Sequence, residues 1–173
     1  IAGTIPRQQL REFIDKWRLV EWHNLYILML GQSRHPDDIA YIRNKTEAAA
    51  YGFNTNLSAW VTAFIETNPD TGVDEIENLY FSNKSRTTVE LQEVCKALSV
   101  LGSEGGFRVA PELVERRHRI VRSYGTLLEN HPRMAGPVAK DLTIWQIRAL
   151  VERLTQIKEN ESALDPDTKM AIT

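Results

Sequence analysis

The residues best suited to chemistry lie in one arginine-rich segment, VERRHRIVRSYG, at positions 114–125. At about 100° per residue, the apolar side chains of a helix through this segment share one sector, and Arg117 falls in the middle of it. Arg119 and Arg122 point the other way, and Arg116 lies at the boundary. A buried guanidinium keeps its proton, so Arg117 needs a carboxylate, a phosphate or a row of carbonyl groups as its partner.

Two hypotheses account for that partner. Buried arginines are usually paired within the fold, here with an acidic residue of another helix such as Asp141 or Glu47. Alternatively, Arg117 lines a groove in which a nucleic-acid phosphate completes the pair. Under this second hypothesis the nucleic-acid-binding residues are Arg108, Arg116, Arg117, Arg133, Lys140 and Tyr124.

The distribution of charge favours the nucleic-acid hypothesis locally. Between positions 108 and 153, nine Arg and Lys residues face five Asp and Glu residues, an excess of four positive charges. Over the whole chain, 21 basic residues balance 23 acidic ones, which disfavours a protein coated in positive charge. Phe107, Tyr124 and Trp145 could stack on unpaired bases. Positions in the core explain the same three rings better.

Other catalytic and metal-binding patterns are missing from the sequence. The four histidines have no i, i+4 partner, and Cys95, the only cysteine, permits neither an internal disulfide nor a multi-cysteine zinc site. GSEGG at 102–106 lacks the Lys and Ser or Thr of a phosphate-binding loop and is typical of a flexible linker. We therefore expect no metal, no cofactor and no enzymatic activity, although an enzyme with residues from distant segments stays open.

Proline and glycine mark the helices of the first part of the chain. A first amphipathic helix is expected after Pro6. Apolar residues go all the way round the segment 20–30, which predicts a second helix that is buried on every side and ends at Gly31. Pro36 begins a third helix, which ends at Gly52.

Two further stripes have the apolar spacing of a helix face. They comprise Leu57, Trp60, Val61, Phe64 and Ile65, and then Leu91, Val94, Cys95, Leu98 and Leu101. Thr87 and Glu90 form a capping box in front of the second stripe, and Gly102 ends it. We expect Cys95 to face the core.

The remaining helices lie in the second half of the chain. A long helix is expected from Pro111 to about Asn130, and HPRMAGP at 131–137 breaks it. Thr143 and Gln146 then form another capping box, which predicts a last helix over 144–157.

Residues 77–83, ENLYFSN, look like a viral processing-protease site, E-N-L-Y-F-Q-S, without its glutamine. The segment lies mid-chain, after a turn predicted for NPDTG at 68–72. Ile76, Leu79 and Tyr80 have the spacing of one helix face, and acidic residues crowd the first turn. We interpret the segment as a native helix.

These patterns predict an all-α fold, a compact bundle of about seven helices. We expect one domain over 1–160, a polar tail over 161–173, and mobile ends. No apolar run approaches the roughly 20 residues that cross a bilayer, so we expect no membrane partner. The lone cysteine fits a reducing compartment, either the cytoplasm or a virion.

The last helix offers a candidate partner interface formed by Ile144, Ile147, Val151 and Leu154. The leading hypothesis is a non-enzymatic, self-associating helical protein that packages single-stranded nucleic acid, with RNA as the candidate partner, along an arginine-lined groove. The alternative is a helical adaptor or regulatory module, in which Arg117 pairs internally and the last helix binds a protein partner.

Overall fold

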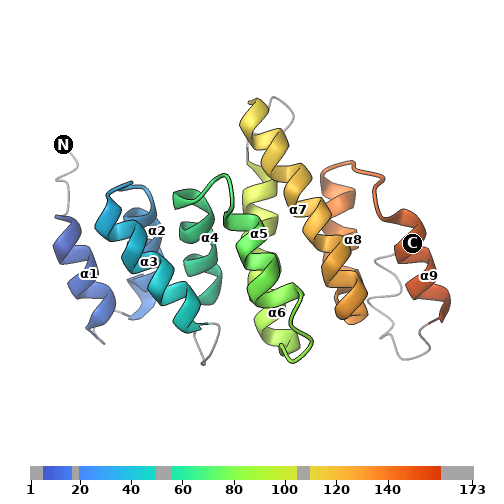
Figure 1. Ribbon diagram of the computed structural model, residues 1–173, viewed down its shortest axis with the longest axis horizontal. Coiled ribbons are helices and arrows are strands. Elements are labelled where there is room, and N and C mark those ends of the chain that lie inside the picture. Colours follow the sequence, from blue (N-terminus) through green and yellow to red (C-terminus); the bar gives the residue numbers. More distant parts are fainter. Residues whose placement is uncertain (1–5, 17–19, 50–55, 105–109, 161–173) are drawn as a thin grey trace. The chain divides into compact units, whose positions relative to one another are not determined.

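The computed structural model describes residues 6–16, 20–49, 56–104 and 110–160 (Figure 1). Within these residues the regular structure is helical and contains no strand, which confirms the predicted all-α class. Nine α-helices lie in the described part of the chain, rather than about seven. One unpredicted helix is α8 (Ala135–Ile144), which begins inside the segment that the sequence predicted to be a break.

Contacts between residues divide the chain into two compact units, residues 1–72 (unit 1) and 73–173 (unit 2). Each unit is described by itself below. The single domain predicted for 1–160 stays a prediction, and the predicted tail over 161–173 lies outside the described residues.

Unit 1 contains α1 (Arg7–Asp15), a short 3-10 turn (Val20–Trp22), α2 (His23–Gly31), α3 (Pro36–Ala49) and α4 (Leu57–Thr67). All five residues of the stripe predicted for α4 are buried. The helix α2 packs closely on α4 at Gly31. A Cβ atom added at this glycine would lie only 3.0 Å from that of Ala63. The predicted helix start at Pro36 is confirmed, whereas the predicted end at Gly52 lies outside the described residues.

A buried carboxylate in unit 1 connects two of its helices. Asp38, in the first turn of α3, accepts hydrogen bonds from Arg7 Nη1 at 2.8 Å and Ser33 Oγ at 2.5 Å, and also from Arg11. Burial alone would raise the pKa of Asp38, but the bonds from Ser33, Arg7 and Arg11 outweigh it and lower that pKa. The carboxylate therefore ties α1 to the start of α3.

Unit 2 contains most of α5 (Gly72–Ile76), a π-helix (Glu77–Phe81), α6 (Thr88–Ser103), α7 (Pro111–Asn130), a 3-10 turn (Pro132–Met134), α8, and α9 (Val151–Asn160). The predicted capping box is confirmed at the start of α6. Thr87 Oγ1 accepts a hydrogen bond from the Glu90 amide, and the Glu90 carboxylate accepts one from the Thr87 amide at 2.8 Å. The predicted stripe on α6, including Cys95, is buried.

The segment that resembles a protease site belongs to the core of unit 2. Ile76, Tyr80 and Phe81 are fully buried. The helix widens to a π-helix here, with the Ser82 amide donating to the Glu77 carbonyl at 2.9 Å. Thr126 of α7 also donates to the Glu77 carboxylate at 2.7 Å. A segment with these contacts is a native part of the fold.

The predicted last helix over 144–157 is confirmed only from Val151 onwards, and its predicted start is wrong. Gln146 and Leu150 adopt positive φ angles of 56° and 64°, which a right-handed helix cannot accommodate. Thr143 does not cap a helix, because its hydroxyl lies inside α8 and donates to the Ala139 carbonyl at 2.8 Å. The chain therefore turns between α8 and α9, and α9 begins only at Val151.

The prediction that segment 20–30 is buried on every side is also wrong. His23, Ile27, Leu30 and Gly31 are buried, but other apolar residues of this segment are exposed on the opposite side of α2. The helix has one packed face and one open face. Among the described helices, none has the length and apolar character needed to cross a membrane.

Candidate functional site

Arg117 of α7 binds backbone carbonyl groups at the end of α6. Its Nε atom donates to the Gly102 carbonyl at 2.6 Å, and its Nη2 atom lies 3.5 Å from the Glu104 carbonyl. The last carbonyls of a helix have no partner within the helix and carry the negative end of its dipole. Of the three partners that the sequence permits, the structure therefore has the row of carbonyls.

Neither acidic residue suggested as a partner for Arg117 takes that role. The Asp141 carboxylate accepts hydrogen bonds from Ser99 and Tyr124, and Glu47 lies 3.8 Å from Arg43 within α3. The neighbouring Arg116 binds the Glu104 carboxylate at 2.9 Å. Two arginines of α7 thus hold the C-terminal end of α6 in place.

Trp145 packs against the same end of α6. A Cβ atom at Gly102 would overlap the indole ring, so the ring occupies the space that only glycine leaves open. The indole N–H donates to Ser103 Oγ at 3.0 Å, and the ring stacks on Tyr124 with centroids 6.1 Å apart. Gly102 thus marks a contact between helices and does not end α6 as predicted, because the helix continues to Ser103.

Tyr124 lies in the core of unit 2 and has no exposed surface. Its hydroxyl donates to Asp141 Oδ2 at 2.5 Å, and Ser99 Oγ donates to Oδ1 at 2.6 Å. Burial raises the pKa of Asp141, and the two hydrogen bonds and Lys140 offset only part of that effect. A ring in this position is inaccessible to nucleic-acid bases.

The contacts of Arg116, Arg117 and Tyr124 described above do not include the other predicted nucleic-acid-binding residues. Arg133 and Lys140 are exposed, and neither forms an ion pair with a residue in the described ranges. Arg108 lies outside the described residues, as does Phe107. Arg122 and Arg148 are also exposed on unit 2. The surface of unit 2 therefore carries exposed basic side chains that could contact a ligand, but Arg117 is not one of them.

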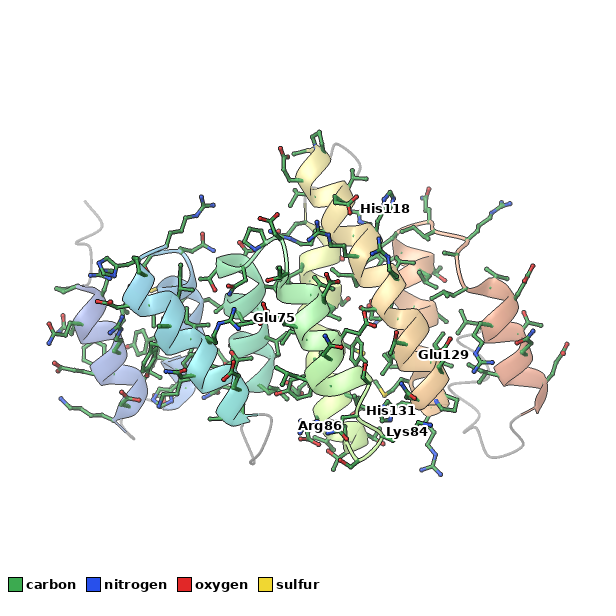
Figure 2. All side chains as sticks on the ribbon, viewed as in Figure 1. Glu75, Lys84, Arg86, His118, Glu129 and His131 are labelled. Carbon is green, nitrogen blue, oxygen red and sulfur yellow. The ribbon has the colours of Figure 1, made fainter. Side chains whose placement is uncertain are left out.

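Arg86 and His131 of unit 2 have a structural role. Figure 2 shows Lys84, Arg86 and His131 near one end of the unit, with His118 in the N-terminal half of α7. Arg86 donates to the Leu79 carbonyl at 3.0 Å and lies over the Tyr80 ring. The His131 ring bonds the Asn83 carbonyl, and burial lowers the pKa of His131. These contacts fix the loop before α6.

The predicted partner interface divides between two helices. Ile144, at the end of α8, and Val151, at the start of α9, are each 52% exposed, whereas Leu154 is buried and Ile147 is half-buried in the turn. Because the helix breaks between them, the four residues do not form one stripe. Only Ile144 and Val151 present a large exposed surface.

Sequence reasoning missed the exposed apolar face of α2. Trp22, Leu25, Leu28 and Met29 are 49%, 45%, 38% and 38% exposed. On a wheel of about 100° per residue they lie within a sector of about 120°, opposite the buried side. Glu21 precedes them, Asn24 lies between Trp22 and Leu25, and Gln32 follows them, and all three polar residues are exposed. Those polar residues are the pattern that could have revealed the open face.

The described residues hold no group of three or more His, Cys, Asp or Glu side chains placed to bind a metal ion. Comparison with protein-family models, with curated proteins and with solved structures finds no match for this chain. The candidate functional site is therefore the exposed apolar face of α2, formed by Trp22, Leu25, Leu28 and Met29.

Proposed function

We propose that this protein is a non-enzymatic helical assembly module that self-associates through the exposed apolar face of α2. The observation that carries the proposal is the exposure of four large apolar side chains on one side of α2, namely Leu25, Leu28 and Met29 of the helix and Trp22, the residue just before it. Contiguous exposed apolar surface of this kind marks interaction sites on soluble proteins. Trp and Met are also enriched at protein interfaces.

The size of the hydrophobic contribution supports association. Full burial of one such side chain is worth about 1.5–3 kcal/mol, and each of these residues has between a third and a half of its surface left to bury. Four of them on each side of an interface can offset a substantial part of the cost of bringing two molecules together. The polar Glu21, Asn24 and Gln32 would form the rim that excludes water from the centre.

A second copy of the chain is the partner that fits this face most simply. An apolar face without charged side chains at its centre is complementary to itself, and a two-fold axis places the same residues on both sides of the contact. We therefore expect a symmetric dimer as the basic unit of assembly.

Sedimentation velocity across a range of protein concentrations tests the proposal. The wild type is expected to shift from monomer to dimer as concentration rises, and Leu25→Asp is expected to remain a monomer because it buries a charge in the contact. Val89→Asp is the matched control, since Val89 is 64% exposed and lies on α6. It should dimerise like the wild type.

A wild type that is monomeric at every concentration would contradict self-association. That result would favour the adaptor alternative, in which exposed Ile144 and Val151 contact a different protein. Equal dimerisation of the Leu25→Asp variant and the wild type would also contradict the role of α2.

Packaging of single-stranded nucleic acid is the second candidate function. It is supported by exposed Arg122, Arg133 and Arg148, which form no ion pair with residues in the described ranges. Binding of single-stranded RNA that weakens steeply with salt, and weakens further in Arg133→Ala, would favour it. Arg117 supports this function less than the sequence suggested, because backbone carbonyls already accept its hydrogen bonds.

A further inference from the structure

Unit 2 contains a groove that shares no residue with the apolar face of α2. It runs between α6 and α8 and has a volume of about 520 Å³. Small-molecule sites in proteins are usually concave and occupy roughly 300–1,000 Å³. We call it the α6–α8 groove. Its volume is suited to one small ligand rather than to a polymer.

The polar groups at the floor of the α6–α8 groove are not available to a ligand. Both carboxylate oxygens of Asp141 already accept hydrogen bonds, from Ser99 at 2.6 Å and from Tyr124 at 2.5 Å. The Cys95 thiol is buried, and burial raises its pKa, so the sulfur stays protonated at neutral pH. With these polar groups buried or occupied, the surface inside the groove is mostly apolar.

Both walls of the groove carry apolar residues and an exposed lysine, and Gln92 adds a polar side chain on α6. Val100, which is 60% exposed, contributes to the α6 wall, and Pro137 contributes to the α8 wall. The two exposed lysines at the rim are Lys96 on α6 and Lys140 on α8. The aliphatic stem of a lysine extends such an apolar surface, while its ammonium group stays in water.

The two lysines differ in the charge that they offer a ligand. Lys96 forms an ion pair with Glu93, three residues earlier on α6. Lys140 forms no ion pair with a residue of the described ranges. The rim therefore has one available positive charge, which favours a ligand with a single negative charge and disfavours a cationic one.

We propose that the α6–α8 groove binds a small amphiphilic monocarboxylate, with its apolar chain against Val100, Pro137 and the floor and its carboxylate beside Lys140. The orientation follows from the position of the charges. The buried Asp141 would repel a carboxylate placed at the floor, whereas the exposed ammonium of Lys140 attracts one at the rim. This proposal does not depend on self-association through α2.

Titration of the full chain with decanoate and with decanol, followed by NMR chemical shifts, tests the proposal. Decanoate is expected to bind saturably and to shift the signals of Val100 and its neighbours in the groove. Lys140→Gln is expected to weaken decanoate binding about two- to fivefold, as for an exposed ion pair, and to leave decanol binding unchanged. Lys84→Gln is the matched control, because Lys84 is an exposed lysine outside the groove (Figure 2).

A second variant tests the location. Val100→Trp fills the groove from an exposed position and should abolish the binding of both ligands without loss of the fold. The proposal is overturned if decanoate shows no saturable binding at millimolar concentration, or if Val100→Trp binds it as the wild type does. Equal weakening by Lys140→Gln and Lys84→Gln would show that Lys140 does not recognise the carboxylate, and would also overturn the proposal.

Discussion

Two polar residues of unit 2, Arg117 and Asp141, have hydrogen-bond partners that lie far away in the sequence. Arg117 donates a hydrogen bond to the carbonyl of Gly102, fifteen residues earlier. Asp141 accepts one from the hydroxyl of Ser99, 42 residues earlier. Each contact joins two helices. Because these partners are hydroxyl groups and backbone carbonyls, the loss of Arg117 leaves no unpaired carboxylate behind. Replacement of Arg117 should therefore cost less stability than the loss of one partner of a buried ion pair.

Arg117→Ala is expected to lower the free energy of unfolding by about 1–2 kcal/mol. The variant loses a charge-assisted hydrogen bond, but the carbonyls that it leaves at the end of α6 can bind water. Arg119→Ala is the control, because Arg119 makes an i, i+4 pair with Glu115 that is worth about 0.3–0.5 kcal/mol. Urea denaturation measures both. A loss of several kcal/mol would show that Arg117 neutralises a buried anion.

Asp141→Asn is expected to change how the stability of the protein depends on pH. The folded pKa of Asp141 is raised, so its contribution is fully present below the unfolded pKa of about 3.9 and is lost as pH rises through the folded pKa. The unfolding free energy of the wild type should therefore exceed that of the variant by the largest amount at acidic pH. Denaturation at several pH values measures it, and a difference that grows with pH would contradict the assignment.

At the scale of the helices, glycine decides how closely two elements approach. Gly102 of α6 leaves room for the Trp145 ring, whereas Gly125 of α7 has ordinary space around it. A Cβ atom at Gly125 would meet only Leu150, at 3.8 Å. Both glycines lie in helices, where alanine is intrinsically preferred by about 1 kcal/mol. Their surroundings, and not their helix propensity, predict opposite results on substitution.

Gly102→Ala is expected to destabilise the protein by about 1–3 kcal/mol, because the new methyl group overlaps Trp145. Gly125→Ala is expected to stabilise it by about 0.4–1 kcal/mol, because the methyl group fits and the unfolded chain loses freedom. Thermal denaturation compares the two. Equal effects of the two substitutions would show that Trp145 does not pack on α6 as described.

At the scale of the whole molecule, each unit has its own buried carboxylate with the opposite dependence on pH. Asp38 in unit 1 has a lowered pKa because Ser33, Arg7 and Arg11 donate to it, whereas burial raises the pKa of Asp141 in unit 2. The stability that Asp38 contributes is present above the unfolded pKa and is lost as pH falls through the folded pKa. Acid therefore weakens unit 1 through this site.

Asp38→Asn is expected to lower the stability of unit 1 at pH 7 by about 1–3 kcal/mol. The value lies below that of a fully buried ion pair because Arg7 and Arg11 are partly exposed and can bind water. The difference from the wild type should shrink as pH falls from 7 to 3. The indole NMR signal of Trp60 reports on unit 1, and that of Trp145 on unit 2. A difference that is independent of pH would contradict the role of Asp38.

Local chemistry in the sequence was enough to predict much of the helical framework. Pro36 and Pro111 begin helices, Thr87 and Glu90 form their capping box, and Gly31 ends α2 as expected. These features depend on φ angles and hydrogen bonds within a few residues, so they can be read without knowledge of the rest of the fold. The apolar stripes of α4 and α6 were predictable for the same reason.

Only the tertiary structure decided which helix faces are packed and which partners the charged groups have. The open face of α2 depends on which side α4 covers, and the positive φ angles at Gln146 and Leu150 interrupt a helix that the local apolar spacing predicted. Arg117 could have met a carboxylate, a phosphate or carbonyl groups, and the approach of α6 to α7 selected the carbonyls. Such choices depend on residues distant in sequence, whereas helix propensity and capping act over a single turn.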